Sequence, residues 1–267
     1  MRGPLEPPQV FLTGASSGIG EALAREWARR RPGVRLGLVA RRAEALDRVA
    51  IGCERAGAGA VARYALDVND RAALTAAADD FAAAGAAGGP FVVVANAGIS
   101  AGTTTGERTD AAVFERIVRT NVVAMFDTFA PFVPLMRSAR RGTLVGIASV
   151  AGVRGLPGSG AYSASKAAAV TYLESARVEL AASGVRVVTI APGFVRTPMT
   201  ARNPYRMPFL MEADAFALRA VDAVERGARF ATIPWQMGMV AALLRRLPRP
   251  LYDAAFRHAP RKPRAAE

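Results

Sequence analysis

Short apolar runs alternate with helix-compatible segments along most of the chain, and this alternation limits the folds it can adopt. Parallel strands need long crossover connections, and helices of this length supply them. We therefore expect one α/β domain with a Rossmann-type, doubly wound parallel sheet of about seven strands and helices on both faces, with ligands bound at the carboxyl ends of the strands. The expected strands are 9–13, 34–40, 61–66, 91–95, 143–148, 185–191 and 229–234, and the expected helices include 21–31, 71–84, 110–137, a segment around Tyr162, and 212–227.

The 267 residues divide into three expected parts. Residues 1–7 form a disordered N-terminal arm, 8–234 a catalytic domain, and 235–267 a basic C-terminal extension. The extension mixes apolar stripes with arginines, a pattern typical of a segment that lies on an anionic membrane or covers a neighbouring subunit. Packing onto the body of the protein or onto a subunit is the alternative, so membrane contact is a hypothesis.

The net charge of +13 raises the question of a polyanionic partner. Most arginines, however, are scattered beside acidic residues on expected helix faces, and no nucleic-acid readout motif is present, so we expect no nucleic-acid partner. A single cysteine, Cys53, excludes an intrachain disulfide, and no apolar run is long enough to span a bilayer. These features favour a cytoplasmic protein.

The first expected strand leads directly into a glycine-rich turn followed by a helix. Such a turn directs backbone N–H groups and the positive end of a helix at an anion, and its glycines leave room for a pyrophosphate. The spacing G-x-x-x-G-x-G differs from the commoner G-x-G-x-x-G. The residues expected to contact a dinucleotide here are Gly14, Ser16, Ser17, Gly18, Ile19 and Gly20.

The second expected strand ends at Ala40-Arg41-Arg42, where NAD-binding proteins of this fold have an acidic residue. A carboxylate would repel a 2′-phosphate, whereas a guanidinium pairs with one. We therefore expect NADP(H) in preference to NAD(H), with Arg41 in contact with the cofactor. The alternative is that Arg41 and Arg42 only begin a solvated helix.

Several further motifs follow in a fixed order. They are Asp67-Val68, Asn96-Ala97-Gly98, Asn121, Ser149 thirteen residues before Tyr162-x-x-x-Lys166, and Pro192-Gly193 with Val195 and Thr197. Together with the glycine turn, over about residues 8–235, they resemble the short-chain dehydrogenase/reductase family. The family often has a second Asn where this chain has Ala95, a departure that touches no catalytic group.

The resemblance implies that Asn121, Ser149, Tyr162 and Lys166 are catalytic and that the other motif residues, with Tyr162 and Lys166, contact the cofactor. We expect the Lys166 ammonium and an oxidised nicotinamide to lower the pKa of Tyr162, the acid-base, while Lys166 also holds the nicotinamide ribose. Ser149 would donate a hydrogen bond to the substrate oxygen, and Asn121 would anchor a water linked to Lys166. Each has a structural alternative: Ser149 as a turn former, Asn121 as a buried structural residue, and Asp67 and Thr197 as caps.

The expected reaction interconverts a carbonyl and an alcohol, with no metal. Residues 196–212 are expected to form a lid whose apolar side chains favour a hydrophobic substrate, although these side chains could equally pack the lid onto the body. A non-catalytic dinucleotide sensor or a membrane-associated interaction protein is the alternative function. The family resemblance also implies a homodimer or homotetramer.

Overall fold

A computed structural model describes residues 6–85, 88–201 and 203–264. Residues 1–5 of the expected N-terminal arm lie outside the described residues. The strands form one seven-stranded parallel sheet in the order β3-β2-β1-β4-β5-β6-β7, which confirms the expected Rossmann-type fold. The strands are β1 (Gln9–Thr13), β2 (Arg35–Ala40), β3 (Ala60–Ala65), β4 (Phe91–Ala95), β5 (Gly142–Ile147), β6 (Val185–Pro192) and β7 (Phe230–Ile233).

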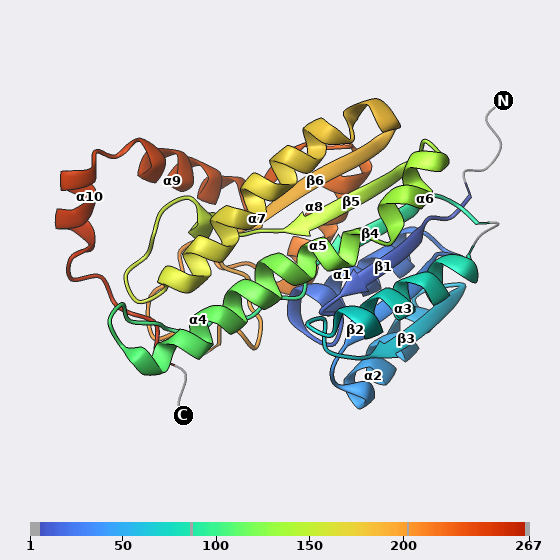
Figure 1. Cartoon of the computed structure of the whole chain (residues 1–267), viewed down its shortest axis with the longest axis horizontal. Helices are drawn as coiled ribbons and strands as arrows, with labels where there is room; N and C mark the ends of the chain where they lie inside the picture. Colours follow the sequence, from blue (N-terminus) through green and yellow to red (C-terminus); the bar gives the residue numbers. More distant parts are fainter. Residues whose placement is uncertain (1–5, 86–87, 202, 265–267) are drawn as a thin grey trace.

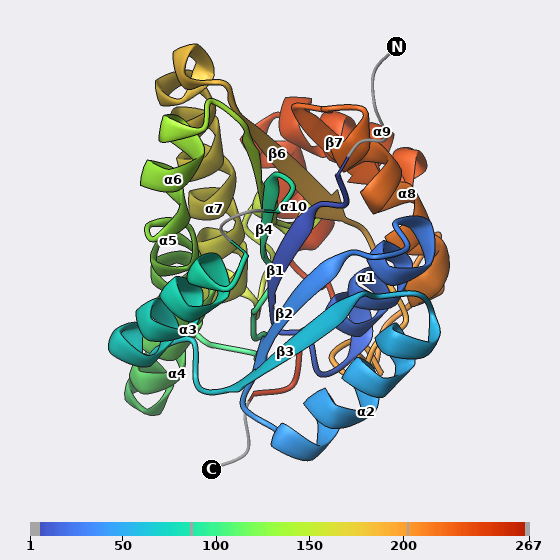
Figure 2. The same ribbon diagram turned by 90° about the vertical axis from the view of Figure 1, so that its right-hand side faces the viewer.

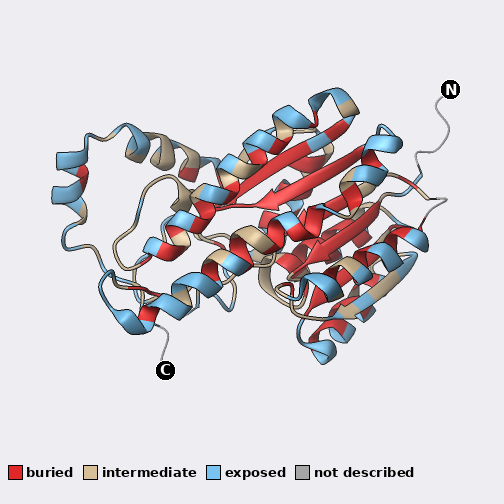
Figure 3. Cartoon of the chain, viewed as in Figure 1, coloured by how far each residue is buried: buried red, intermediate tan, exposed pale blue. Residues whose placement is uncertain are grey.

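Helices cover both faces of the sheet, because alternate strand residues point to opposite sides. Val10 and Leu12 of β1 pack into an apolar cluster with α1 (Gly18–Arg30), α2 (Ala43–Arg55) and α8 (Ala213–Glu225). Phe11, between them, belongs to the opposite cluster. Figure 2 shows the two helical layers, and Figure 3 shows burial concentrated on the strands and on the inward sides of the helices. The elements of the second layer are α3 (Arg71–Ala83), α4 (Ala111–Val118), α5 (Ala124–Phe129), α6 (Phe132–Ser138) and α7 (Gly160–Glu179).

The single helix expected over 110–137 is interrupted, so that prediction was wrong in its continuity. A π-helical turn, Arg119–Val123, joins α4 to α5, and α6 begins after Pro131. Proline lacks the N–H that a continuing helix requires, which explains the second interruption. The π-helical turn contains Asn121, whose side chain is buried.

The C-terminal extension consists of α9 (Trp235–Arg246), α10 (Arg249–Phe256) and a tail that returns toward the N-terminal end of α4 (Figure 1). The extension packs on the loop before α7. The Tyr252 hydroxyl donates to the Gly155 carbonyl at 2.6 Å, and the Arg154 guanidinium lies 4.2 Å from the centre of the Tyr252 ring. No helix within the described residues has the length and apolar character needed to cross a bilayer.

Candidate active site

The glycine turn after β1 has the tight backbone that a dinucleotide pyrophosphate requires. Gly14 and Gly18 have φ angles of +70° and +57°, in the left-handed region that glycine tolerates. A Cβ at Gly20 would lie 2.1 Å from the Gly14 carbonyl oxygen. Ser17, the residue before α1, makes no side-chain capping bond to the first turn of this described helix, so that turn presents backbone N–H groups to an anion. These residues fit a nucleotide phosphate group.

Asn96, at the carboxyl end of β4, fastens the glycine turn to the centre of the sheet. Its Nδ2 donates to the Thr13 and Gly14 carbonyls at 2.9 and 3.2 Å. The backbone N–H of Ala97 donates to the Thr13 hydroxyl at 3.2 Å. The sequence motif therefore ties two strand ends together, and its last residue, Gly98, faces the side chains of Asn121 and Lys166.

The two arginines after β2 lie at the edge of the expected cofactor site. Arg41 is largely exposed, and its guanidinium lies 3.8 Å from the Asp67 carboxylate. Arg42, which the sequence did not single out as a contact, donates to the Ser16 hydroxyl in the glycine turn at 3.3 Å. Both guanidinium groups are therefore near the residues expected to hold the adenosine half of a dinucleotide.

Asp67 follows β3 and shapes the turn before α3. Its Oδ1 accepts hydrogen bonds from both the backbone and the side chain of Asn69, each at 2.9 Å. The capping residue of α3 is Asp70, so Asp67 is not the helix cap that was its alternative role. Val68 is buried in the apolar cluster on the α3 face.

The loop after β6 reaches back to the glycine turn. A Cβ at Gly18 would lie 3.0 Å from the Thr197 Cγ2, so Thr197 adjoins the start of α1. The Gly193 N–H donates to the Ile233 carbonyl at 2.8 Å, and buried Val195 forms a β-bridge with Met211. Thr197 also bonds with Thr200, so it stabilises its own loop as well.

Ser149 and Tyr162 come together at the carboxyl end of β5. The Ser149 hydroxyl acts on the Tyr162 phenol and lowers its pKa, and the Ser149 Oγ accepts a hydrogen bond from the Ala151 N–H at 3.1 Å. Ser149 therefore forms the turn that follows β5 and also contacts Tyr162. Tyr162 lies in the first turn of α7, which presents its phenol next to this strand end.

Lys166 lies one helical turn further along α7 and is 4% exposed. Its Nζ donates to the Ile147 carbonyl at 2.7 Å and lies 5.9 Å from the centre of the Tyr162 ring. A Cβ at Gly98 would lie 3.6 Å from this Nζ and 3.3 Å from the Asn121 Oδ1. Lys166 and Asn121 thus border the same small space beside Gly98.

The Asn121 side chain makes three hydrogen bonds. It accepts from the Ile99 N–H at 2.9 Å and donates to the Ile99 carbonyl at 3.0 Å and to the Ser165 hydroxyl at 2.9 Å. The π-helical turn places the amide to make all three bonds. Asn121 links the loop after β4 to α7, a structural role that the sequence offered only as the alternative.

The expectation that the Lys166 ammonium lowers the pKa of Tyr162 needs correction. Burial raises the pKa of Tyr162, the hydrogen bond from Ser149 lowers it, and the nearby Tyr205 hydroxyl raises it. Burial also lowers the pKa of Lys166 to about 8. Desolvation dominates because Lys166 is buried and Tyr162 is partly buried between α7 and the strand ends. Ser149 is thus the group that favours the Tyr162 phenolate.

Two residues near Tyr162 were not predicted as site residues. Tyr205, inside the expected lid, acts electrostatically on Tyr162, and its ring lies 6.4 Å from that of Phe194. Lys262, from the C-terminal tail, has its Nζ 5.9 Å from the centre of the Tyr162 ring. The chain has only two lysines among 35 Lys and Arg residues, and this rarity was the sequence signal for Lys262.

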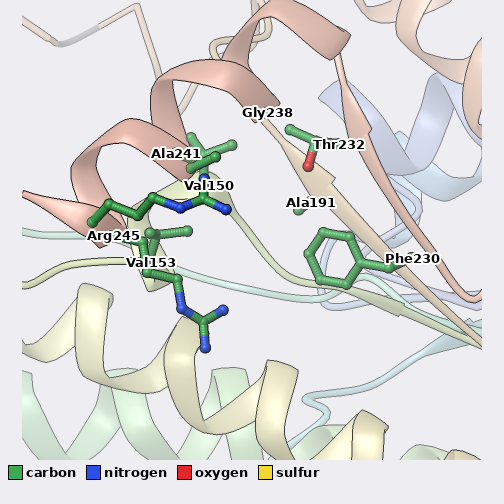
Figure 4. Close-up of a pocket in the computed structure, with 10 residues that line it drawn as sticks. Val150, Val153, Ala191, Phe230, Thr232, Gly238, Ala241 and Arg245 are labelled. Atoms are coloured by element: carbon green, nitrogen blue, oxygen red, sulfur yellow. The ribbon is translucent and has the colours of Figure 1, made fainter.

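A cavity of about 500 Å³ lies behind the Ser149 turn, between β6, β7 and α9 (Figure 4). No sequence motif pointed to it. It contains none of the predicted site residues, although Val150 and Ala191 are immediate neighbours of Ser149 and Pro192. Its lining comprises Val150, Val153, Ala191, Phe230, Thr232, Gly238, Ala241, Ala242, Arg245 and Arg246.

Comparisons with known proteins agree with this geometry. Residues 8–206 match the family model described as short chain dehydrogenase. An uncharacterized oxidoreductase of Myxococcus xanthus (strain DK1622) is 43% identical over 249 residues, covering 93% of this chain and 96% of that protein. The cis-4-hydroxycyclohexanecarboxylate dehydrogenase of Sinomonas cyclohexanicum is 36% identical over 195 residues, covering 73% of this chain and 76% of its own length.

Solved structures share the fold. A short-chain dehydrogenase from Sphingobium yanoikuyae in complex with NADPH has a TM-score of 0.76 at 28% identity, covering 91% of this chain and 97% of that one. A short-chain dehydrogenase/reductase from Burkholderia phymatum in complex with NAD has a TM-score of 0.80 at 23% identity, covering 98% and 99%.

The matched family, the sheet order and the Ser149, Tyr162 and Lys166 arrangement agree. This chain belongs to the short-chain dehydrogenase/reductase family, as an NAD(P)-dependent oxidoreductase.

Proposed function

We propose that this protein is an NADP(H)-dependent reductase or dehydrogenase that interconverts a ketone or aldehyde with its alcohol, on a substrate with a substantial apolar part. The observation that carries the proposal is that Ser149 and Tyr162 meet at the carboxyl end of β5, where Ser149 lowers the pKa of the Tyr162 phenol, with buried Lys166 one helical turn away. A dinucleotide sensor that does no chemistry would not require a paired phenol and hydroxyl there.

In the proposed reaction, Tyr162, Ser149 and Lys166 have separate roles beside the cofactor. When bound, the nicotinamide cofactor donates or accepts the hydride. Tyr162 delivers a proton to the substrate oxygen during reduction and takes it back during oxidation. Its raised pKa keeps the phenol protonated at neutral pH, which is the form that reduction requires. Ser149 donates to the same oxygen as negative charge develops there, and Lys166 holds the ribose.

The preference for NADP(H) rests on Arg41 and Arg42. Neither position after β2 carries a carboxylate, and Arg42 already contacts Ser16 in the glycine turn. Two guanidinium groups at this edge would form charge-assisted bonds with a 2′-phosphate, which are stronger than the hydrogen bonds they could donate to the 2′-hydroxyl of NAD.

An apolar part of the substrate is supported by the lid, in which Met199 and Phe209 are exposed. The name of the Sinomonas relative gives a cyclic hydroxy acid as its substrate, which is compatible with an alcohol of this kind.

The test is a screen of ketones, aldehydes and alcohols, with NADPH and NADH in parallel. We expect turnover of at least one apolar carbonyl and a higher kcat/KM with NADPH. Tight NADPH binding without turnover of any carbonyl or alcohol would favour the non-catalytic sensor instead.

Two partner proposals come from exposed apolar side chains. Exposed apolar side chains lie on α4, α5 and α7, which supports a homodimer or homotetramer through these helices; they are Phe114, Phe126 and Val178.

A second set of exposed apolar side chains, Trp235, Met239 and Leu243, forms a stripe on α9. It lies beside Arg245 and Arg246, which supports peripheral contact of a cytoplasmic protein with an anionic membrane. Failure to sediment with anionic liposomes at low salt would count against membrane contact.

A further inference from the structure

The two lysines of the chain lie at the same tyrosine. The Nζ atoms of Lys166 and Lys262 are each 5.9 Å from the centre of the Tyr162 ring. Lys166 comes from the same helix as Tyr162, whereas Lys262 comes from the tail at the far end of the chain. Every other basic side chain is Arg, apart from His258. A compact ammonium, which Arg does not provide, is thus present twice and at one site.

The tail is held in place by backbone contacts on both sides of Lys262. The Gly102 N–H donates to the Pro263 carbonyl at 2.9 Å, and a Cβ at Gly102 would lie 2.3 Å from the Lys262 carbonyl oxygen. A Cβ at Gly158 would similarly lie 2.8 Å from the Arg261 Cβ. Only glycine at these two positions lets the tail approach so closely.

An ion pair fastens the end of the tail. The Arg264 guanidinium contacts both carboxylate oxygens of Asp110, through bonds of 3.0 to 3.1 Å, and donates to the Thr109 hydroxyl at 2.8 Å. A two-point guanidinium–carboxylate contact fixes direction as well as distance. The position of Lys262 is therefore determined by its neighbours on the main body of the protein.

The ammonium of Lys262 has unused hydrogen-bond donors. It donates to the Ser100 hydroxyl at 2.7 Å, and it forms no ion pair with a carboxylate among residues 6–85, 88–201 and 203–264. An ammonium has three N–H donors, so two remain for another acceptor. Burial lowers the pKa of Lys262, because partial enclosure disfavours the charged form of the ammonium.

We propose that Lys262 is a substrate-binding residue that selects carbonyl or alcohol substrates carrying a compact anionic group, such as a carboxylate, near the reacting carbon. This rests on the proposed function, because the reacting oxygen must lie at the Tyr162 hydroxyl. The anionic group would then contact the Lys262 Nζ beside the same ring. With the apolar lid, the site would accept an amphipathic acid.

The first test compares matched substrates that differ only in charge. Acetoacetate and levulinate are measured beside their methyl esters with NADPH, in the wild type, Lys262→Met and Lys262→Arg. A charge-assisted hydrogen bond predicts that Lys262→Met lowers the acid-to-ester ratio of kcat/KM by roughly 10- to 100-fold, and that Lys262→Arg restores it only in part, because a guanidinium keeps the charge but is not a compact ammonium. Arg257→Met, which removes an exposed charge from the same extension, should leave the ratio unchanged.

A second variant leaves Lys262 intact and moves the tail. Gly102→Val places a side chain against the Lys262 carbonyl, so it should lower the acid-to-ester ratio in the same direction as Lys262→Met. A ratio that is the same in wild type, Lys262→Met and Gly102→Val, or a wild type that prefers the esters, would overturn the proposal.

A measurement without turnover separates this inference from the proposed function. The NADPH-loaded full chain is treated with an amine-acetylating reagent, and acetylation of Lys262 is followed by peptide mass spectrometry. We expect levulinate, but not methyl levulinate, to slow Lys262 acetylation several-fold, with or without catalysis. Equal rates with acid and ester would show that Lys262 only packs the tail, even if the enzyme reduces carbonyls.

Discussion

At the residue scale, burial controls the protonation of Tyr162 and Lys166 more than their mutual attraction does. Lys166 is buried and Tyr162 is partly buried beside it, and desolvation disfavours the charged form of each. The Lys166 ammonium donates a hydrogen bond to the Ile147 carbonyl, and it forms no ion pair with a carboxylate among the described residues. The site therefore keeps a costly buried cation next to a neutral phenol, as a site prepared to receive negative charge would.

The destabilisation caused by burying the Lys166 ammonium depends on pH. The pKa of Lys166 is lowered from 10.5 to about 8, so the unfolded chain binds more protons between these values. The Lys166 contribution to the free energy of unfolding should rise by roughly 3 kcal/mol from pH 8 to pH 10.5, and be lost as pH falls through 8. Denaturant unfolding of wild type and Lys166→Met should show this change in their difference. A difference independent of pH would contradict the burial argument.

The two arginines after β2 give a second prediction for single residues. Replacing Arg41 and Arg42 together by Ala should lower the ratio of NADPH to NADH kcat/KM by about 10- to 100-fold, because two charge-assisted contacts to the 2′-phosphate are lost. Arg48→Ala, which removes an exposed arginine from the same helix, is the control. If the ratio of NADPH to NADH kcat/KM is unchanged in the double variant, Arg41 and Arg42 do not contact the cofactor and only form the solvent-exposed start of α2.

At the element scale, the ion pair between Asp110 and Arg264 connects the tail to the segment before α4. Arg264 lowers the pKa of Asp110, so the ion pair stabilises the tail above the ordinary Asp pKa and is lost as pH falls through the lowered value. Asp110→Asn should free the tail locally. We expect several-fold faster hydrogen exchange at the Gly102 N–H, which donates to Pro263, and unchanged exchange in β5. If the Gly102 N–H exchanges at the same rate in wild type and Asp110→Asn, the backbone contacts alone hold the tail.

The elements themselves were largely predictable from the sequence, because apolar runs and helix periods repeat regularly. The segment 110–137 was only partly predictable, because Pro131 marks the break before α6 whereas no residue type marks the π-helical turn. The π-helical turn at Asn121 depends on side-chain bonds to Ile99 and Ser165, which lie far away in sequence. The motif residues predicted for the site do gather at the strand ends, but Lys262 arrives through tail contacts that no local pattern encodes. The pKa of Tyr162 likewise depends on burial, which the spacing of Tyr162 and Lys166 does not report.

At the scale of the whole molecule, the exposed aromatic residues of the α4–α5 surface predict self-association. Light scattering should give the mass of a dimer or tetramer, and Phe126→Glu, at a side chain that is 53% exposed, should shift it toward the monomer. Ile51→Glu, at a 44% exposed position on α2, is a control on another surface. A monomer in the wild type at micromolar concentration would contradict the proposed assembly.

The central claim is that Tyr162 transfers the proton in an NADPH-dependent carbonyl reduction. Its most direct test is the kcat/KM of Tyr162→Phe for the best carbonyl substrate, measured with the NADPH dissociation constant of the same variant. Removing the hydroxyl should lower kcat/KM by at least about 100-fold while NADPH binding stays within about twofold of wild type. Turnover close to that of the wild type, with NADPH bound equally well, would contradict the account.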